Sequence, residues 1–154
     1  GTLNRTFQGY TVSHATDLLG FGMSAIGEVG GAYAQNEKNV RAWSARIDEG
    51  ALPIVRGFEL SRDDQLRRFV IRALMCRFFI DDAVLQRRFG VTLAGALPDA
   101  LERLQPLVAE GLATLSPGRV EVTPLGRLFV RNVAAAFDAY LHGSTAQVPY
   151  SRAV

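Results

Sequence analysis

The most informative stretch of this chain is RTFQGYT at residues 5–11, followed by LLGFGMSAIG at residues 18–27 and YAQN at residues 33–36. Side chains in the first segment alternate with a period of two, which predicts a strand and not a helix. A strand with both polar and aromatic side chains usually has one side facing a lumen or a ligand. Because no partner strand precedes it, we expect this stretch to be the closing edge of a larger catalytic barrel that begins upstream.

Bulk composition narrows the class of protein without indicating a function. The 154 residues suit one or at most two domains, and 48% hydrophobic with 21% charged residues is ordinary for a soluble globular chain. A single cysteine excludes an internal disulfide framework and favours a cytoplasmic location. No apolar run has membrane-spanning length and no signal peptide is evident, so we expect no membrane partner.

The sequence divides near Pro53, and the predicted fold class is α+β. Residues 1–52 are expected to form the edge of a barrel and a connecting helix at 37–49. Residues 53–60 are expected to be an extended linker or a short strand, and residues 61–154 a mainly helical domain.

The second part has the helix and hairpin order of a winged-helix-like module. Ser116-Pro117-Gly118 marks the hairpin turn, and Pro106 is expected to kink or divide the helix that contains it. The predicted elements are helices at 61–78, 82–89 and 98–110, a hairpin of strands 112–115 and 119–123, and a last helix at 124–141.

Winged helices often bind DNA, and the helix before the hairpin would then lie in the major groove. Residues 98–112 carry a net charge of −2. Because phosphate neutralisation supplies most non-specific affinity, an acidic helix is repelled by the duplex. We therefore expect no nucleic-acid partner and favour a packing role for the module.

Arginines are concentrated in the helix at 61–78, which holds five arginines and two aspartates. One interpretation is a solvated helix face. The alternative is contact with an anionic ligand or an acidic surface, because guanidinium groups pair well with carboxylates.

Reactive residues are few. The glycines at 20 and 22 match part of a dinucleotide-binding pattern, but the strand and acidic residue that such a site needs are missing, so close backbone approach is the better explanation. Cys76 lies beside the apolar stripe of its helix, and His14 stands alone in a loop. No cluster has metal-ligand spacing and no nucleophile is recognisable, so we assign no catalytic and no metal-binding residue.

Six segments are distinctive in composition and order: RTFQGYT, DLLGFGMSAIG, YAQNEK, LMCRF, VTPLGRLFVRNVAAAFDAYL and YSRAV. In these segments the chain resembles the C-terminal third of the oxygen-independent coproporphyrinogen III oxidases, a family of radical S-adenosylmethionine enzymes. The resemblance extends from Arg5 to Val154. It implies that residues 6–32 complete a partial (β/α) barrel and that residues after about Leu60 form a separate helical cap.

The resemblance also implies a reaction for the parent protein. With a 4Fe-4S cluster held by three cysteines and with S-adenosylmethionine, the family decarboxylates two propionates of coproporphyrinogen III to vinyl groups, giving protoporphyrinogen IX. The parent is expected to be cytoplasmic and monomeric. The cluster cysteines are absent from this chain, which should therefore carry no cluster, bind none of these cofactors and have no turnover alone.

Three positions match family contacts to a second S-adenosylmethionine, namely Phe7, Gln8 and Ile26. Ordinary barrel packing remains the alternative for Phe7 and Ile26. As a further hypothesis, the cap closes over the substrate, and arginines such as Arg67, Arg68 and Arg72 hold its propionates.

Two other functions remain open. One is a related haem-handling protein of the same radical superfamily, which binds haem without decarboxylating a porphyrinogen. The other is a free-standing winged-helix interaction module.

Overall fold

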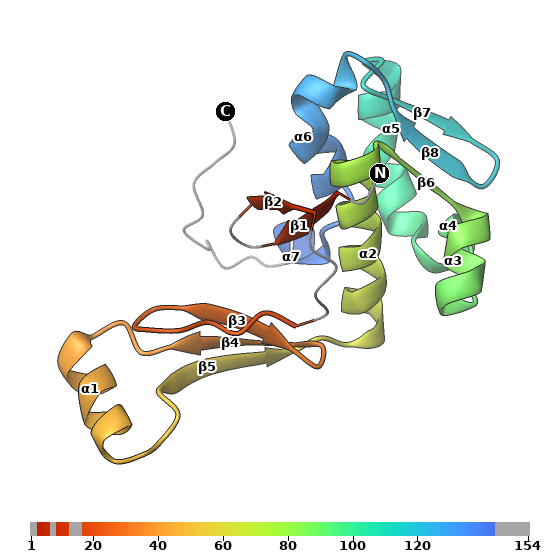
Figure 1. The fold of residues 1–154 in the computed structure, drawn as a ribbon. Helices are drawn as coiled ribbons and strands as arrows, with labels where there is room; N and C mark the ends of the chain where they lie inside the picture. Colours follow the sequence, from red (N-terminus) through yellow and green to blue (C-terminus); the bar gives the residue numbers. More distant parts are fainter. Residues whose placement is uncertain (1–2, 7–8, 13–16, 144–154) are drawn as a thin grey trace. The chain divides into compact units, whose positions relative to one another are not determined.

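The computed structural model describes residues 3–6, 9–12 and 17–143. The chain has mixed helix and strand and divides into two compact units, residues 1–65 and 66–154, which are described separately below (Figure 1). No helix in the described ranges combines the length and apolar character needed to cross a bilayer.

The first unit begins with a hairpin. Strand β1 (Asn4–Thr6) pairs antiparallel with β2 (Gly9–Thr11), and Arg5 lies opposite Tyr10. Gly9 has φ +136°, a backbone conformation that L side chains rarely adopt, and it allows the chain to reverse. The expectation of one strand without a partner is therefore wrong, because the two halves of the segment pair with each other. Phe7 and Gln8 lie outside the described residues.

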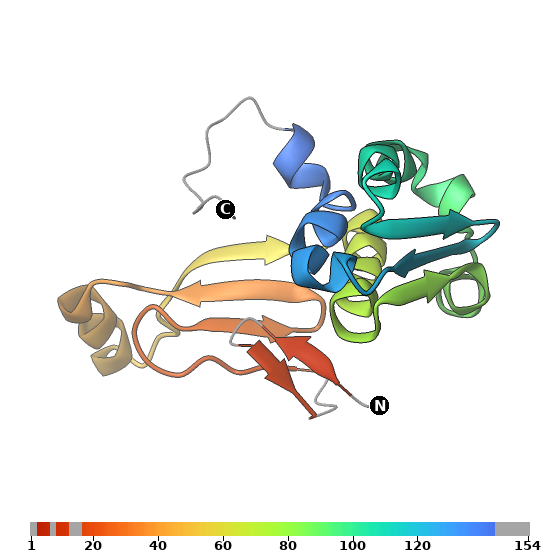
Figure 2. The same ribbon diagram turned by 90° about the horizontal axis from the view of Figure 1, so that it is seen from above.

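A three-stranded antiparallel sheet follows in the order β3-β4-β5 (Figure 2). Its strands are β3 (Ile26–Val29), β4 (Ala32–Asn36) and β5 (Ile54–Glu59). Gly30 and Gly31 have φ of +58° and +84°, the positive values that a tight two-residue hairpin turn requires. Segment 53–60, expected to be a linker or a short strand, contains the edge strand β5.

Helix α1 (Val40–Asp48) connects β4 to β5 and confirms the helix expected at 37–49, with a later start. The amide of Ala42 donates to the Asn39 side chain, which caps the helix. The Glu37 carboxylate accepts from the amides of Asn39 and Lys38, and these hydrogen bonds lower the pKa of Glu37.

Helix α2 (Arg62–Arg77) runs from the first unit into the second. Ser61 caps it as expected: the Asp64 amide donates to Ser61 Oγ, and the Ser61 amide donates to the Asp64 carboxylate. The apolar stripe of this helix is buried at Leu66, Val70, Ala73 and Leu74, and its remaining member, Phe69, is half-buried.

The second unit confirms the predicted hairpin and the two middle helices. The observed elements are α3 (Asp82–Phe89), α4 (Leu93–Ala96), α5 (Pro98–Ala109), β7 (Ala113–Ser116) and β8 (Arg119–Val122). Gly90 ends α3 in the left-handed conformation, at φ +72°. Helix α5 runs through Pro106 as one helix, so the proline does not divide it.

A short strand, β6 (Phe79–Asp81), was not predicted. It pairs with β8, which gives a second three-stranded sheet in the order β6-β8-β7, with α5 beside the β7–β8 hairpin (Figure 1). The strand follows α2 after one residue, Phe78, at φ +65°. Its three residues are too few to show a sequence periodicity of their own.

The predicted last helix at 124–141 is wrong as a continuous element. It consists of the 3-10 turn η1 (Gly126–Phe129), α6 (Val130–Ala135) and α7 (Ala139–Gly143). The break after α6 places Phe137 in the core with no exposed surface. Asp138 then accepts hydrogen bonds from the amides of Tyr140 and Leu141 and starts α7.

The second unit contains almost all of the buried apolar side chains. Its core joins α2, α3, α5, the β6–β8–β7 sheet and α6, and its fully buried members of largest volume are Phe137, Leu74, Ile80, Leu85, Leu93, Leu97 and Leu104. In the first unit, Pro53 and Leu60 are the two buried residues among those that the structure describes.

Candidate functional site

One face of the sheet in the first unit carries Ile26, the described member of the predicted site. Ile26 lies opposite Gln35 on β4, and Gln35 lies opposite Arg56 on β5. Side chains of directly opposed residues share one face of a sheet, so these three form a row across it.

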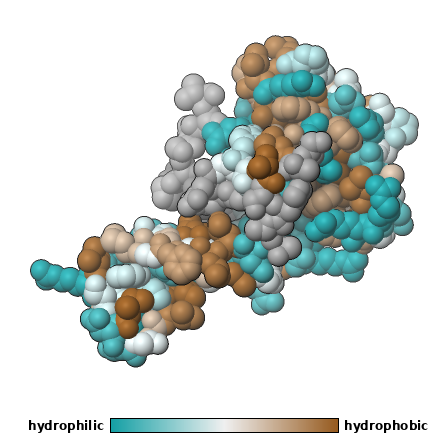
Figure 3. Space-filling view, in the orientation of Figure 1, coloured by the Kyte–Doolittle hydropathy of each residue, from teal (hydrophilic) through white to brown (hydrophobic). Residues whose placement is uncertain are grey.

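A second row lies two residues along the strands. Tyr33 lies opposite both Glu28 and Phe58, and the strand period of two places this row on the same face as Ile26. The face has a hollow of about 250 Å³, lined by Ile26, Tyr33, Ala34, Gln35, Arg56, Gly57 and Phe58. Figure 3 shows apolar side chains over this sheet, and Phe58 is 44% exposed.

The chemistry of the hollow suits a ligand that is partly flat and partly anionic. Tyr33 and Phe58 provide aromatic rings, Gln35 provides an amide donor and acceptor, and Arg56 provides a guanidinium group. Small-molecule sites usually enclose about 300 Å³ or more. The sheet therefore provides one wall of such a site and not a whole one.

The glycine-rich segment is held against the start of β3 by backbone contacts. The amides and carbonyls of Leu18 and Glu28 exchange two hydrogen bonds of 2.7 and 2.8 Å. A Cβ on Gly20 would lie 2.9 Å from the Ile26 carbonyl, and one on Gly27 would lie 3.0 Å from the Leu18 oxygen. The prediction that glycines here allow close backbone approach is confirmed at these two positions.

Asn36, at the end of the YAQN motif, ties the same segment to β4. Its side-chain amide donates to the carbonyls of Gly22 at 2.9 Å and Gly20 at 3.4 Å. The Ser24 amide donates to the Glu37 carbonyl at 2.8 Å. Three bonds thus position the loop that leads into Ile26.

The sequence analysis singled out Ile26 but none of the residues on β4 and β5 that share its face of the sheet. Tyr33 and Gln35 alternate in YAQN, so the motif contained the signal for two of them. Arg56 and Phe58 lie in the segment expected to be a linker, and only the strand register shows that they share the face of Ile26.

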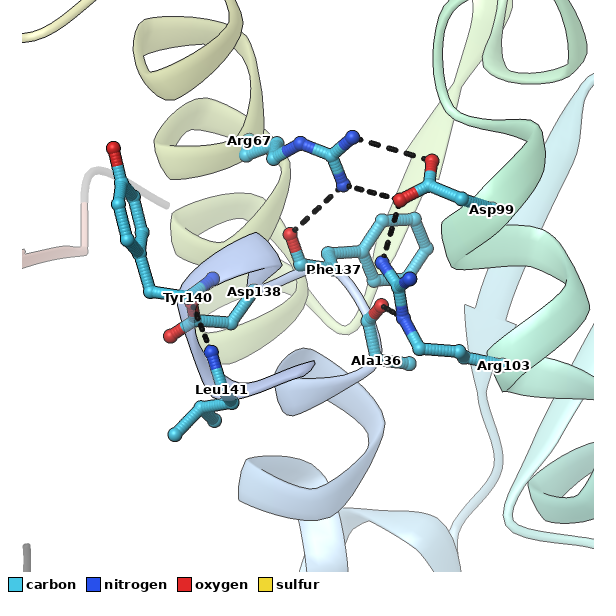
Figure 4. Close-up of polar contacts among 8 residues, drawn as sticks. All are labelled: Arg67, Asp99, Arg103, Ala136, Phe137, Asp138, Tyr140 and Leu141. Atoms are coloured by element: carbon cyan, nitrogen blue, oxygen red, sulfur yellow. Dashed lines mark hydrogen bonds and ion pairs between the residues drawn. The ribbon is translucent and has the colours of Figure 1, made fainter. Parts of the chain in front are cut away.

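The second unit contains a separate polar cluster, the Asp99 clamp, formed by Asp99, Arg67 and Arg103 (Figure 4). Asp99 lies in the first turn of α5, with oxygens 3.1 Å from Arg67 Nη1 and 2.8 Å from Arg103 Nη2. Arg103 Nε also donates to the Ala136 carbonyl at 2.8 Å, and Arg67 Nη1 donates to the Phe137 carbonyl at 3.5 Å. The clamp therefore fixes the backbone at the break between α6 and α7.

The charge of Asp99 is strongly favoured. Partial burial alone would raise the pKa of Asp99, but the hydrogen bonds from Arg67 and Arg103 outweigh it and lower the pKa to about 2. A carboxylate that accepts from two guanidinium groups is stable as an anion over the whole physiological range.

The clamp bears on the hypothesis that arginines of α2 hold propionates. The Arg67 side chain is only 12% exposed and is already paired with Asp99. Arg67 is therefore a structural residue of the second unit. Arg68 and Arg72 are half-buried and have contacts of their own.

No group of three histidine, cysteine, aspartate or glutamate side chains in the described ranges could hold a metal ion. Cys76 is half-buried on α2. His14 lies outside the described residues.

A family model described as the HemN C-terminal domain matches residues 60–129. The chain is also similar, over its full length, to curated proteins named oxygen-independent coproporphyrinogen III oxidase. It is 40% identical to the protein of Salmonella typhimurium and 39% identical to that of Escherichia coli K12, and in each case it covers 34% of the relative. The chain thus spans about a third of the length of these relatives.

The chain is also similar in three dimensions to a solved structure. Its title is "Coproporphyrinogen III oxidase (HemN) from Escherichia coli is a Radical SAM enzyme", and it superposes with a TM-score of 0.86 at 40% identity. The match covers 90% of this chain and 32% of that one.

Proposed function

We propose that this chain is the C-terminal third of an oxygen-independent coproporphyrinogen III oxidase, and that it serves the oxidative decarboxylation of coproporphyrinogen III to protoporphyrinogen IX within such an enzyme. The observation that carries the proposal is the 40% identity over all 154 residues, which includes both units.

We further propose an arrangement for each unit. The β3–β4–β5 sheet forms part of the edge of a partial (β/α) barrel; because its strands are antiparallel, it would extend that edge and not supply the parallel strands. The second unit would be a winged-helix-like cap, which the order of α2, β6, α3, α5 and the β7–β8 hairpin supports.

Ile26 is proposed to contact a second S-adenosylmethionine, together with Phe7 and Gln8. The residues around Ile26 fit that molecule: Tyr33 and Phe58 suit a purine ring, and Arg56 suits a carboxylate. In this class of enzyme the radical comes from S-adenosylmethionine reduced by the 4Fe-4S cluster, so that step is not assigned to the second molecule proposed here.

An iron–sulfur cluster does not fit the residues of this chain. Such clusters need several cysteine thiolates, and the chain has one cysteine, Cys76, on α2. We therefore propose no reaction step in which this chain holds a cluster. We expect the chain to be inactive by itself.

A chimera tests the function. This chain replaces the matching part of the Escherichia coli relative, and the anaerobic conversion of coproporphyrinogen III is measured with S-adenosylmethionine and a reductant. We expect protoporphyrinogen IX to form, whereas the relative truncated at the same point should form none. A folded chimera that binds haem without converting the substrate would favour the haem-handling alternative.

A pair of variants in that chimera tests the site. Ile26→Asp places a charge in the hollow and should weaken binding of S-adenosylmethionine by about tenfold or more, because a charged group is costly beside an apolar ligand surface. Val29→Asp is the matched control, since Val29 lies on the opposite face of the same strand and is 47% exposed. Equal binding by both variants would remove Ile26 from the site.

A further inference from the structure

The arginines of the second unit fall into two classes. Arg67 and Arg103 are paired with Asp99, and Arg119 lies 3.1 Å from Glu121 and 3.8 Å from Asp81. The second class contains exposed arginines that take part in no ion pair among the residues that the structure describes, namely Arg77, Arg87, Arg88, Arg127 and Arg131. Arg68 and Arg72 are half-buried and have contacts of their own.

Arg77 and Arg88 meet at one aromatic ring. The guanidinium carbon of Arg88 lies 4.9 Å from the centre of the Phe69 ring, and that of Arg77 lies 5.9 Å from it. Arg88 is also 5.9 Å from the Phe89 ring, which packs on Phe69 at 5.5 Å between ring centres. The end of α2 and the end of α3 together form this arginine pair.

The carboxylates that follow α2 are engaged elsewhere. Asp81 accepts from the Val84 amide at 2.9 Å and faces Arg119, and Asp82 accepts from the Leu93 amide at 2.7 Å. The two positive charges are therefore not neutralised by the β6–α3 segment. Figure 3 shows hydrophilic side chains over the part of the surface where α3 lies.

Stacking prepares the two arginines for a partner. A guanidinium group held over a ring keeps its N–H donors in its own plane, where they can still bind a carboxylate. Because the side chain is already restricted, less conformational entropy is lost when it binds. The arginines of the first class already use N–H donors in ion pairs with carboxylates.

We propose that the Arg77–Arg88 pair binds an acidic segment of a partner protein. Alternate side chains of an extended peptide lie about 7 Å apart, so two carboxylates of such a segment can reach two guanidinium groups that share one ring. Nucleic acid is the less suitable partner, because phosphate neutralisation supplies most of the non-specific affinity for it and the whole chain has a net charge of only +2.

Fluorescence anisotropy with a labelled poly-glutamate peptide, at low salt, tests the proposal on the whole chain. The double variant Arg77→Gln, Arg88→Gln should bind the peptide about tenfold more weakly, because it removes both charge-assisted contacts. The matched control is Arg127→Gln, Arg131→Gln, which changes the net charge equally. Arg127 is also exposed and stacks on Phe78 at 4.6 Å, so the control removes the same kind of group from another place.

The control should stay within about twofold of the unchanged chain, as surface charges away from a contact affect affinity weakly. Equal losses in the two double variants would overturn the proposal, since net charge alone would then explain binding. Tighter binding of an oligothymidylate of equal charge, lost in Arg77→Gln, Arg88→Gln, would also overturn it in favour of nucleic acid. Thermal unfolding followed by circular dichroism verifies that all variants are folded. The single variants Arg88→Gln and Arg127→Gln repeat the comparison of peptide affinity with one charge removed instead of two.

Discussion

At the scale of single residues, the Asp99 clamp brings two guanidinium groups to one carboxylate. Asp99 and Arg103 are four residues apart on α5, a spacing at which side chains on a helix meet. Arg67 comes from α2, 32 positions earlier, and brings a second charge to the same carboxylate. One residue thereby links two helices to the turn at Ala136 and Phe137.

Replacing Asp99 by Asn should destabilise the second unit by about 1–3 kcal/mol at neutral pH, because Arg67 would remain nearly buried without its anionic partner. Urea unfolding monitored by circular dichroism measures the change. Glu102→Gln on the same helix is the control, since it removes the same charge from an exposed position. A loss no larger than that of the control would mean that the clamp contributes nothing to stability.

The same pair of variants gives a pH dependence of known sign. The pKa of Asp99 is lowered by folding from 3.8 to about 2, so its contribution to stability is present above pH 3.8 and is lost as the pH falls through that range toward 2. The stability difference between the unchanged chain and Asp99→Asn should therefore shrink over this interval. A constant difference would exclude Asp99 as the titrating group.

At the scale of elements, the sequence predicted boundaries well where capping signals are local. Helix α3 begins and ends where the pattern placed it, because Asp81 and Gly90 provide both caps within the segment. The last helix was predicted poorly, because its periodicity continues across a break that contacts with Arg67 and Arg103 stabilise. A pattern within one segment carries no information about such partners.

The start of η1 is another place where a distant partner decides the structure. Gly126 packs on the carbonyl of Leu112, and an added Cβ would overlap that oxygen. Thr123 connects the same two segments: its hydroxyl donates to the Gly111 carbonyl at 2.7 Å and accepts from the Gly126 amide at 3.0 Å. Glycine is required here by close approach and not by a positive φ.

Gly126→Ala should therefore destabilise the second unit by at least about 2 kcal/mol, since backbone must move to admit the methyl group. Leu128→Ala serves as the control, because Leu128 is 80% exposed and its truncation should cost less than about 0.5 kcal/mol. Thermal unfolding of the two variants gives the comparison. If both variants unfold at the same temperature as the unchanged chain, η1 does not pack closely on Leu112.

At the scale of the whole molecule, the two units differ sharply in buried apolar surface. The second unit has an extended core, whereas several large apolar side chains of the first unit are exposed: Leu19, Phe21, Met23, Val29, Val40, Ile47, Leu52, Ile54, Val55 and Phe58. Because burial of apolar surface is the main stabilising contribution to folding, the first unit should be much the less stable.

Unfolding of the chain should consequently not be a single transition. Trp43 is the only tryptophan and lies on α1 in the first unit, so its fluorescence reports that unit, whereas most helix signal comes from the second. The fluorescence transition in urea should occur at lower denaturant than the circular dichroism transition. Val120→Ala removes buried methyl groups from β8. It should lower the free energy of unfolding of the second unit by about 1–3 kcal/mol and so shift only the circular dichroism transition. Coincident transitions would show that the units unfold together.

Features that depend on neighbours along the chain follow from the amino-acid sequence alone. These are the strand and helix periods, the caps at Ser61 and Gly90, the β7–β8 turn, and the resemblance to the family, which rests on collinear motifs. Each is set within a few residues, by backbone sterics and local hydrogen bonds. Tertiary structure alone decided which distant residues share a surface. It placed Arg56 on the same face of the sheet as Ile26, ended α6 at the Asp99 clamp and brought Arg77 and Arg88 to the same aromatic ring, because side-chain packing and charge pairing act through space.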